Sequence, residues 1–361
     1  MSPPRAPPEL IADAVAEILL RIPPDEPADL LRASLVCKPW LRVASDPAFL
    51  RRYRAFHRGA PLLGFFYSID CRSYDTLFIP TTAARAQPLR RPADDDHNWL
   101  VRDCRHGRVL LRKAPRKFAV WDPITGHLEE LPKHHILYSF HSAVVLCAVA
   151  GCDHRNCHDG PFRVLCVGSD RADMAIRACV YSSETSAWGT LDSAYLDGGS
   201  IFEVTRPAII GDEIYCLVDF GANILKYDLV KHCFSLISLP AVYEKKPLLM
   251  QNADGSLGLA GVTDSRLHLW SWKVNSEGVT GWVPWRVIKL KRLPNADVFG
   301  FAEGVGVFLL GSNAGVFTFD LKSGRMRDVG KSMDYCTFFP LISFFTPDYA
   351  CGKSSLLAEA N

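Results

Sequence analysis

Apolar residues in the first part of the chain recur every three or four positions, which is the spacing of one face of an α-helix. Between 10 and 22 the apolar positions are Leu10, Ile11, Ala14, Val15, Ile18, Leu19 and Ile22. The charged residues Asp13, Glu17 and Arg21 fall off this stripe. Pro23, with further prolines at 24 and 27, ends the helix because proline lacks the backbone donor and clashes with the preceding turn.

Two more short helices are expected before residue 58. Asp29 can cap a second helix. Its apolar positions are Leu30, Leu31 and Leu35, and it leads into Val36 and Trp40. A third helix is predicted to begin at Asp46 and Pro47, with Asp46 as the cap and Pro47 at the first helical position.

Together these helices make a module of about 45 residues, a size at which a domain is only marginally stable alone. Any one of the helices, taken singly, resembles an ordinary core helix. The combined apolar stripe, however, is wider than so small an interior requires. An exposed apolar face of this kind usually marks a site for a partner protein.

From about residue 62 the pattern changes from helical to alternating, which is typical of β-strands. A loose unit recurs near 100–132, 141–192, 200–240, 246–291 and 297–330. In its clearest copies a strand ends in an aromatic residue and Asp, as at Trp121-Asp122 and Phe319-Asp320, and a tight turn follows. Such repeats of about four short strands predict a β-propeller. The strands near 62–80 and 337–346 are expected to pair into a sixth unit and close the ring. A pair of β-sandwiches is the competing architecture.

Three blocks of the helical segment resemble an F-box, the motif that docks substrate receptors onto the Skp-type adaptor of a cullin–RING ubiquitin ligase. They are Ala16-Glu17-Ile18-Leu19-x-Arg21-Ile22-Pro23, then Val36-Cys37-Lys38-x-Trp40, then Ser45-Asp46-Pro47-x-Phe49. The whole chain is also similar to the large plant set, especially from grasses, of F-box proteins with a β-rich carboxy-terminal domain.

The resemblance implies a small all-α F-box module at 1–58, an all-β propeller-like domain of about six blades at 62–347, and a disordered tail at 348–361. It implies a substrate-recognition subunit of an SCF (Skp–cullin–F-box) ligase that holds an unknown protein target on its β domain. The residues it assigns to adaptor binding are Leu10, Ile11, Val15, Ile18, Leu19, Ile22, Pro23, Leu35, Val36 and Trp40. A structural F-box protein acting outside ubiquitination is a further possibility.

Composition agrees with a protein of the cytosol or nucleus. A net charge of +2 on 361 residues gives no strong field, so general attraction to nucleic acid or membranes is not expected. The first residues lack an apolar run, so we expect no signal peptide. The twelve cysteines are scattered, many in strand-like runs, which favours buried reduced thiols.

One cluster has the composition of a metal site: Cys152-x-His154-x-x-Cys157-His158. Structural zinc sites usually draw their ligands from two separated pairs, whereas a single short loop supplies these residues. We therefore expect no metal and no cofactor, with a zinc site as the alternative. The loop at 151–161 is instead a candidate for target binding, together with those at 81–98, 169–177 and 192–200. Its expected polar contacts are His154, Arg155 and His158.

Other chemical candidates are weaker. The run Asp94-Asp95-Asp96-His97 is expected to be a solvated loop. The tryptophans at 270, 272, 282 and 285 are expected in strand packing, with a ligand-stacking surface as the alternative. The sequence contains neither Gly-x-Ser-x-Gly nor His-Glu-x-x-His. We therefore expect no enzyme. The rival is an enzyme or a glycan- or ligand-binding propeller whose helices merely cap it.

Overall fold

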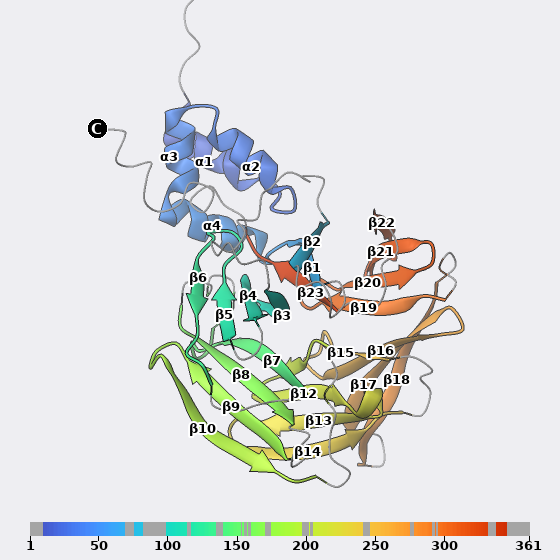
Figure 1. Ribbon diagram of the computed structural model, residues 1–361. Helices are drawn as coiled ribbons and strands as arrows, with labels where there is room; N and C mark the ends of the chain where they lie inside the picture. Colours follow the sequence, from blue (N-terminus) through green and yellow to red (C-terminus); the bar gives the residue numbers. More distant parts are fainter. Residues whose placement is uncertain are drawn as a thin grey trace, which may run out of the picture.

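The computed structural model describes residues 10–344 except for 69–75, 82–98, 114–116, 135–139, 153, 155–156, 158–159, 170–174, 197–201, 203–204, 241–245, 275–277, 291–292, 294 and 331–336. Four helices lie together at one side of a ring of β-sheets (Figure 1). Within the described residues, none of the helices has both the length and the apolar character needed to cross a membrane.

Among residues 10–58, the helical module contains four helices rather than the three that the sequence predicts. They are α1 (Ala12–Leu20), α2 (Pro27–Ser34), α3 (Lys38–Ser45) and α4 (Pro47–His57). The expected second helix is split because Pro39, in the first turn of α3, cannot continue a helix from upstream. The cap predicted at Asp29 is wrong, since α2 already begins at Pro27. Asp46 caps α4 as predicted: its carboxylate accepts a hydrogen bond from the Ala48 N–H at 3.1 Å.

The module has its own core, into which one residue from the end of the propeller also packs. The buried apolar residues of this core are Val15, Leu19, Leu20, Leu30, Ala44, Phe49, Leu50, Tyr53 and Phe344. The Tyr53 ring lies edge-on to that of Phe344, with centroids 6.2 Å apart. The Tyr53 hydroxyl donates to the Ile22 carbonyl oxygen at 2.8 Å, which fixes the chain after α1. Helices and propeller therefore share a packed contact.

In the part of the chain that the structure describes, twenty-three strands form six antiparallel sheets around the ring. The first blade joins β2 (Thr76–Pro80), β1 (Leu62–Ser68) and β23 (Phe338–Ile342). The second has β3 (Leu100–Arg105), β4 (Arg108–Lys113), β5 (Lys117–Trp121) and β6 (Leu128–Glu130). The third has β7 (Phe140–Cys147), β8 (Phe162–Ser169), β9 (Ile176–Ser182) and β10 (Ala187–Ala194).

The remaining three blades also have four strands each. The fourth has β11 (Ala208–Ile210), β12 (Glu213–Val218), β13 (Asn223–Asp228) and β14 (Cys233–Ser238), with a 3₁₀ turn at Asp219–Gly221. The fifth has β15 (Leu248–Gln251), β16 (Leu257–Thr263), β17 (Arg266–Val274) and β18 (Thr280–Lys289). The sixth has β19 (Asp297–Ala302), β20 (Val307–Ser312), β21 (Gly315–Asp320) and β22 (Met326–Gly330).

The first blade closes the ring by pairing the two ends of the propeller. β23 pairs antiparallel with β1, with Phe66 opposite Phe339, and it lies beside β3 and β19. This pairing confirms the predicted sixth unit and excludes the β-sandwich alternative. Closure is favourable because an open ring would leave two unpaired sheet edges.

The turns between the third and fourth strands of the second, fourth and sixth blades have the chemistry that the repeat predicts. Asp122, Asp228 and Asp320 each accept backbone hydrogen bonds from residues two or three positions ahead, at 2.6–3.2 Å. An Asp side chain at the first turn position commonly acts in this way. The positive-φ place that follows is filled by Gly126 and Gly324 in two copies, and by His232 in the other. The core lies between neighbouring blades, as in the cluster joining Leu267 and Leu269 to Phe308 and Leu310.

Candidate functional site

Helix α1 has two apolar faces, and only one of them is covered. Val15 and Leu19 are 1% and 0% exposed and belong to the module core. Ile11 and Ile18, seven residues apart and thus on one side of the helix, are 71% and 44% exposed. An amphipathic helix of a monomer normally keeps such a face polar. The outer face of α1 is therefore available to a partner.

A second exposed apolar site lies at the turn between α2 and α3. Leu35 and Val36 are 76% and 65% exposed, and Leu10 before α1 is 56% exposed. Cys37, also exposed, is extended and leads into α3. We call the exposed residues Leu10, Ile11, Ile18, Leu35 and Val36 the outer apolar set.

The structure sorts the ten residues predicted to bind an adaptor. Those of the outer apolar set and Pro23 are exposed, and Ile22 and Trp40 are partly buried against the module core. Val15 and Leu19 are corrected to core residues, since the packing of α1 on α3 and α4 removes them from the surface. The prediction that the apolar stripe is too wide for one interior is confirmed, but the sequence does not show which half faces inward.

Charged contacts next to this surface fix α1 against α4. Glu17 pairs with Arg52 of α4 and, at 3.4 Å, with Arg21. The hydrogen bond from Arg52 lowers the pKa of the Glu17 carboxyl. These side chains are solvated, so the pair orients the helices and contributes little stability.

His154, predicted to contact a target, is exposed and lies at the junction between module and propeller. Its ring stacks on that of His106 with centroids 4.0 Å apart. His106 and Gly107 form the two-residue turn between β3 and β4, both with positive φ. A small cavity beside them is lined by Arg54 of α4 and by Phe344. Burial, with His154 and nearby arginines, lowers the pKa of His106 to about 3, so that ring is neutral. Arg155 and His158 lie outside the described residues.

The candidate loops do not start from one face of the propeller. In the third blade Cys147 lies opposite Phe162 at one end of the sheet, where the 151–161 segment connects β7 to β8. Ser169 lies opposite Ile176 at the other end, and Ala194 pairs with Ile176 there too. The segments 169–177 and 192–200 therefore leave from the end opposite to 151–161. The segment 81–98, with Asp94–His97, lies almost entirely outside the described residues.

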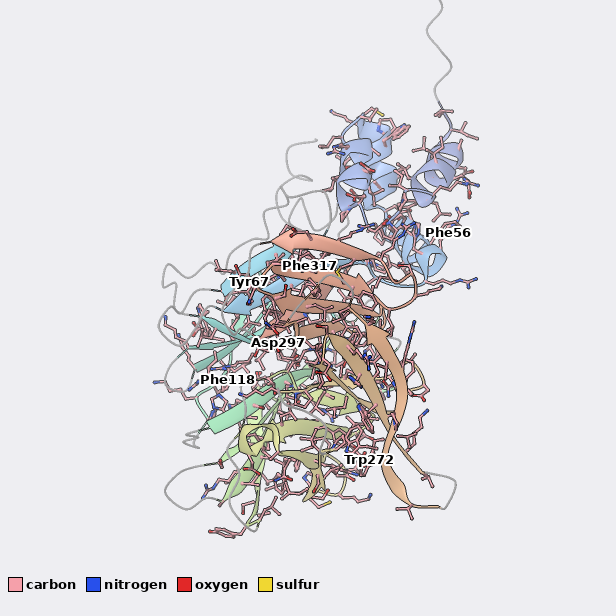
Figure 2. The ribbon with its side chains drawn as sticks, turned by 90° about the vertical axis from the view of Figure 1, so that its right-hand side faces the viewer. Phe56, Tyr67, Phe118, Trp272, Asp297 and Phe317 are labelled. Atoms are coloured by element: carbon pink, nitrogen blue, oxygen red, sulfur yellow. The ribbon has the colours of Figure 1, made fainter. Side chains whose placement is uncertain are left out.

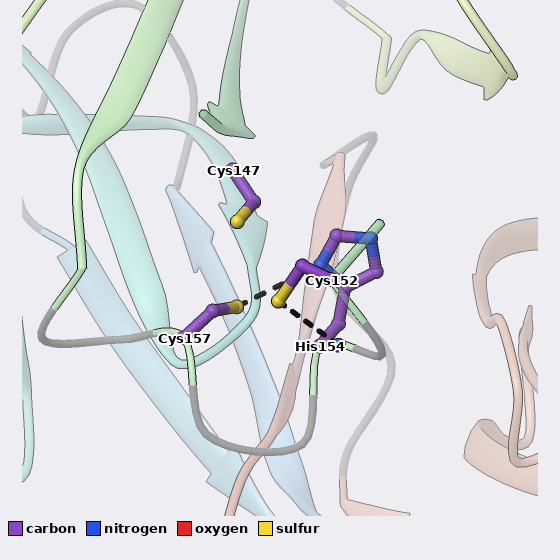
Figure 3. Close-up of side chains that lie close together, drawn as sticks. All are labelled: Cys147, Cys152, His154 and Cys157. Atoms are coloured by element: carbon purple, nitrogen blue, oxygen red, sulfur yellow. Dashed lines mark hydrogen bonds between the residues drawn. The ribbon is translucent and has the colours of Figure 1, made fainter. Parts of the chain in front are cut away.

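Four potential metal ligands come together where β7 meets β8 (Figure 3). They are Cys147, Cys152, His154 and Cys157, and their ligand atoms all lie within 4.8 Å of one another. Sequence reasoning missed Cys147 because it ends a strand and looked like a buried strand residue. Burial, followed by the neighbouring thiols Cys147 and Cys152, raises the pKa of the Cys157 thiol to about 12.

A second cluster of charged groups lies near the ring centre, where the inner strands converge. Asp103 and Arg105 come from β3, Arg206 precedes β11, and Glu303 follows β19. Arg105 reaches Asp103 and Glu303 at 3.0 Å each, and Arg206 reaches them at 3.4 and 3.1 Å. We call these four residues the central ion cluster. It joins three blades, and its two positive and two negative charges balance.

Hydrogen bonds from two more blades complete the central ion cluster. The Val145 N–H donates to Asp103 and the Gln251 N–H donates to Glu303, each at 3.1 Å. Burial alone would raise the pKa of Glu303, but Arg206 and Arg105 outweigh burial and hold it below its ordinary value. The central ion cluster therefore has a structural role, because it holds the blades together at the centre of the ring. The sequence does not reveal it, because its residues are spread over 200 positions.

The tryptophan cluster belongs mainly to strand packing, as expected. Trp272 and Trp282 meet edge-on with centroids 5.1 Å apart, and Figure 2 labels Trp272 on the fifth blade. The Trp282 Nε1–H donates to the Ser238 carbonyl oxygen of the fourth blade at 3.0 Å, so it ties two blades together. Trp285 is the exception, with 46% of its surface exposed.

Comparison with known proteins agrees with this architecture. Residues 16–56 match the F-box-like family model. Residues 100–296, more than half of the chain, match the model described as F-box protein AT5G49610-like, beta-propeller. The F-box protein At5g03970 of Arabidopsis thaliana is 23% identical over 277 residues. The match covers 72% of this chain and 64% of that relative, so this chain spans less than two thirds of its length.

Two solved structures are similar to this chain at low identity. A chain from "Crystal Structure of Mitotic Checkpoint Complex" is 13% identical with a TM-score of 0.40, covering 70% of this chain and 72% of that one. A chain from "Structure of SapL1 lectin in complex with alpha methyl fucoside" is 15% identical with a TM-score of 0.45, covering 75% and 93%. With TM-scores this low, neither likeness indicates what this chain binds. The family match over more than half of the chain, with the F-box helices before the six-bladed ring, establishes that this chain belongs to the plant-type F-box proteins with an AT5G49610-like β-propeller.

Proposed function

We propose that this protein is a substrate-recognition subunit of an SCF ubiquitin ligase. The outer apolar set docks onto a Skp-type adaptor, and the propeller holds a protein target near the transfer machinery of the ligase. The protein itself is not an enzyme in this proposal, because its contribution is proximity between target and ubiquitin donor. The F-box and propeller matches support this role at the level of the family.

The exposed second face of α1 is the observation that carries the proposal. Ile11 and Ile18 on that face, with Leu35 and Val36 at the α2–α3 turn, are all 44–76% exposed. Fully burying an aliphatic side chain contributes about 1.5–3 kcal/mol. Covering these four side chains therefore supplies on the order of 6 kcal/mol toward association before its costs. A partner helix laid against this face would bury them together.

The rival interpretation, a helical cap on an enzyme or ligand-binding propeller, requires the apolar residues of α1 to pack onto the propeller. They do not: Val15 and Leu19 face the other helices, and Leu10 and Ile18 remain exposed. The contact with the propeller is made elsewhere, through Leu31 of α2, through α4 and through Phe344. This separation leaves the outer apolar set accessible while the module stays anchored.

The decisive experiment is co-purification of the full chain with a Skp-type adaptor, comparing wild type with Ile11→Glu/Ile18→Glu. Both positions are on the surface, so the variant should fold normally and lose adaptor binding by at least 100-fold, since an unpaired charge in a desolvated interface is strongly unfavourable. Leu19 is unsuitable for this test because it is fully buried and a charge there would unfold the module. The matched control is Val230→Glu/Val274→Glu, at propeller positions 69% and 63% exposed. Wild-type affinity of the Ile11/Ile18 variant would refute adaptor docking through α1.

For the target we propose the propeller as the binding domain, without assigning the contact to His154, because that side chain faces the junction with α4. The proposed location is the cytosol or the nucleus, where a fluorescent fusion of the full chain can be observed directly. Affinity purification of wild type and of the Ile11→Glu/Ile18→Glu variant, compared by mass spectrometry, separates adaptor partners from propeller targets. Proteins that remain bound to the variant are captured by the propeller.

A further inference from the structure

The connection between β7 and β8 gathers three cysteines and one histidine around one point (Figure 3). Cys147 is the last residue of β7, whereas Cys152, His154 and Cys157 lie in the segment that leads back to β8. A strand end and a loop thus contribute together, so the chain wraps around the shared point. This removes the objection that one short loop would have to supply every ligand.

The spacing of the ligand atoms suits a small tetrahedral ion. Zn–S bonds of about 2.3 Å and Zn–N bonds of about 2.0–2.1 Å place tetrahedral ligand atoms roughly 3.5–3.8 Å apart. The Cys157 Sγ and His154 Nδ1 atoms are 3.7 Å apart, and all four ligand atoms lie within 4.8 Å. Closing onto a metal therefore requires movements of about 1 Å or less at the side chains. The backbone N–H of His154 also donates a hydrogen bond to the Cys152 Sγ at 3.4 Å, which holds that sulfur toward the cluster.

We propose that Cys147, Cys152, His154 and Cys157 bind one structural Zn²⁺ ion. Three thiolates and one imidazole form a Cys₃His set, a typical closed zinc site that leaves no position for a catalytic water. Sulfur ligands favour zinc over the harder ions magnesium and calcium. Each cysteine thiol releases its proton to the solvent when it binds the ion as a thiolate, so zinc uptake by the reduced protein releases protons.

The site has a structural purpose that follows from its neighbours. His154 stacks on His106, and the two histidines line a small cavity with Arg54 of α4 and Phe344. A metal that fixes the His154 ring thereby fixes the β7–β8 connection against the place where module and propeller meet. Arg108 adds to this by donating to the Gly160 carbonyl oxygen at the end of the connection. Zinc should therefore stabilise this corner of the fold.

The test is metal analysis of the full chain purified under reducing conditions, with zinc measured by mass spectrometry and thiols counted in parallel. Wild type should carry one zinc per chain, and Cys147→Ser and Cys157→Ser should each lose at least 80% of it. The control Cys233→Ser removes an exposed cysteine on β14 and should keep the full amount. Replacement of zinc by Co²⁺ should give the absorption bands of a tetrahedral thiolate site in wild type and in Cys233→Ser.

A second variant keeps the proposal testable if the serine variants fold poorly. His154→Cys supplies a fourth sulfur and should retain one zinc per chain, with a shifted Co²⁺ spectrum. His154→Ala should bind zinc more weakly. A chelator should lower the Tm of wild type but not that of a folded Cys157→Ser. The proposal is overturned by reduced wild-type protein without zinc and with all thiols free, by a Cys152–Cys157 disulfide in place of the metal, or by zinc that remains in Cys147→Ser.

Discussion

Replacing Glu303 with Gln removes one of the two carboxylates that balance Arg105 and Arg206 at the centre of the ring. Both arginines are less than 10% exposed, and they reach Glu303 at 3.0 and 3.1 Å. The variant leaves Asp103 alone to balance two buried guanidinium groups. Removing one partner of a buried ion pair typically costs about 3–5 kcal/mol, because the remaining charge is desolvated and unpaired. We expect a cost at the low end of this range, about 3 kcal/mol. The amide oxygen of the new glutamine at position 303 can still accept the hydrogen bond from the Gln251 backbone N–H.

Thermal unfolding of the full chain measures this cost. For domains of roughly 150–250 residues, 1 kcal/mol corresponds to about 2–4 °C. The propeller is larger, so the low end applies, and Glu303→Gln should lower the Tm by about 6 °C. The matched control is Glu130→Gln, which removes the same group from an exposed pair with Lys117 at 2.7 Å. That change should cost less than about 1 kcal/mol.

A double-variant cycle separates loss of the ion cluster from simple loss of a side chain. Arg206→Met alone should destabilise the propeller, whereas Glu303→Gln/Arg206→Met restores charge balance. Replacing both partners of a buried pair is often nearly neutral. The double variant should therefore be more stable than the sum of the single changes by about 1–3 kcal/mol. Strict additivity, or a Tm change below 2 °C for Glu303→Gln, would refute a coupled central cluster.

Three further predictions concern acid, the cap of α4 and the module core. The pKa of the Glu303 carboxyl is held below its ordinary 4.5 in the fold. The ionised carboxylate therefore stabilises the folded protein fully above pH 4.5, and this stabilisation is lost as the pH falls through the folded pKa. Between pH 5 and pH 3, urea titrations should show a smaller loss of stability for Glu303→Gln than for wild type. Asp46→Ala removes the acceptor for the Ala48 N–H and should cost about 1 kcal/mol, whereas Asp46→Asn should cost only a few tenths; equal losses would contradict a capping role. Trp40→Ala, at a partly buried core position, should cost about 3 kcal/mol and lower the helical melting transition followed by circular dichroism; an unchanged helical transition would contradict the core assignment.

The elements that could be predicted from sequence are those whose signals are local. Helix periodicity, the Asp46-Pro47 start of α4 and the Asp-led turns after the third strands of three blades all depend on neighbours within a few positions. The sequence also contained the signal for the split between α2 and α3, because Pro39 cannot continue a helix from upstream. The apolar residues on both sides of Pro39 nevertheless suggested one continuous helix. Ring closure was inferred from repeat counting together with the cost of open sheet edges.

What could not be predicted depends on contacts between distant segments. Asp103 and Glu303 are 200 positions apart, and a charged residue in an alternating strand is normally expected to face solvent. Only closure of the ring turns those positions inward. In the same way, Cys147 joins His154 only because β7 and β8 pair so that Cys147 lies opposite Phe162. Whether Val15 or Ile18 faces the module core likewise depends on how α1 packs on α3 and α4.

Ring closure and anchoring of the helical module are connected through one short segment. β23 is the strand that closes the propeller, and Phe344, two residues after it, packs into the module core beside Tyr53. The Ser343 N–H donates to the Pro61 carbonyl oxygen, which joins this segment to the start of β1. Opening the β1–β23 pair would therefore withdraw Phe344 from the module as well. In the proposed function, the adaptor-binding face must be held at a fixed orientation to the target-binding domain, because proximity accelerates transfer only when the geometry is maintained. In this fold, the strand that completes the propeller also provides that connection.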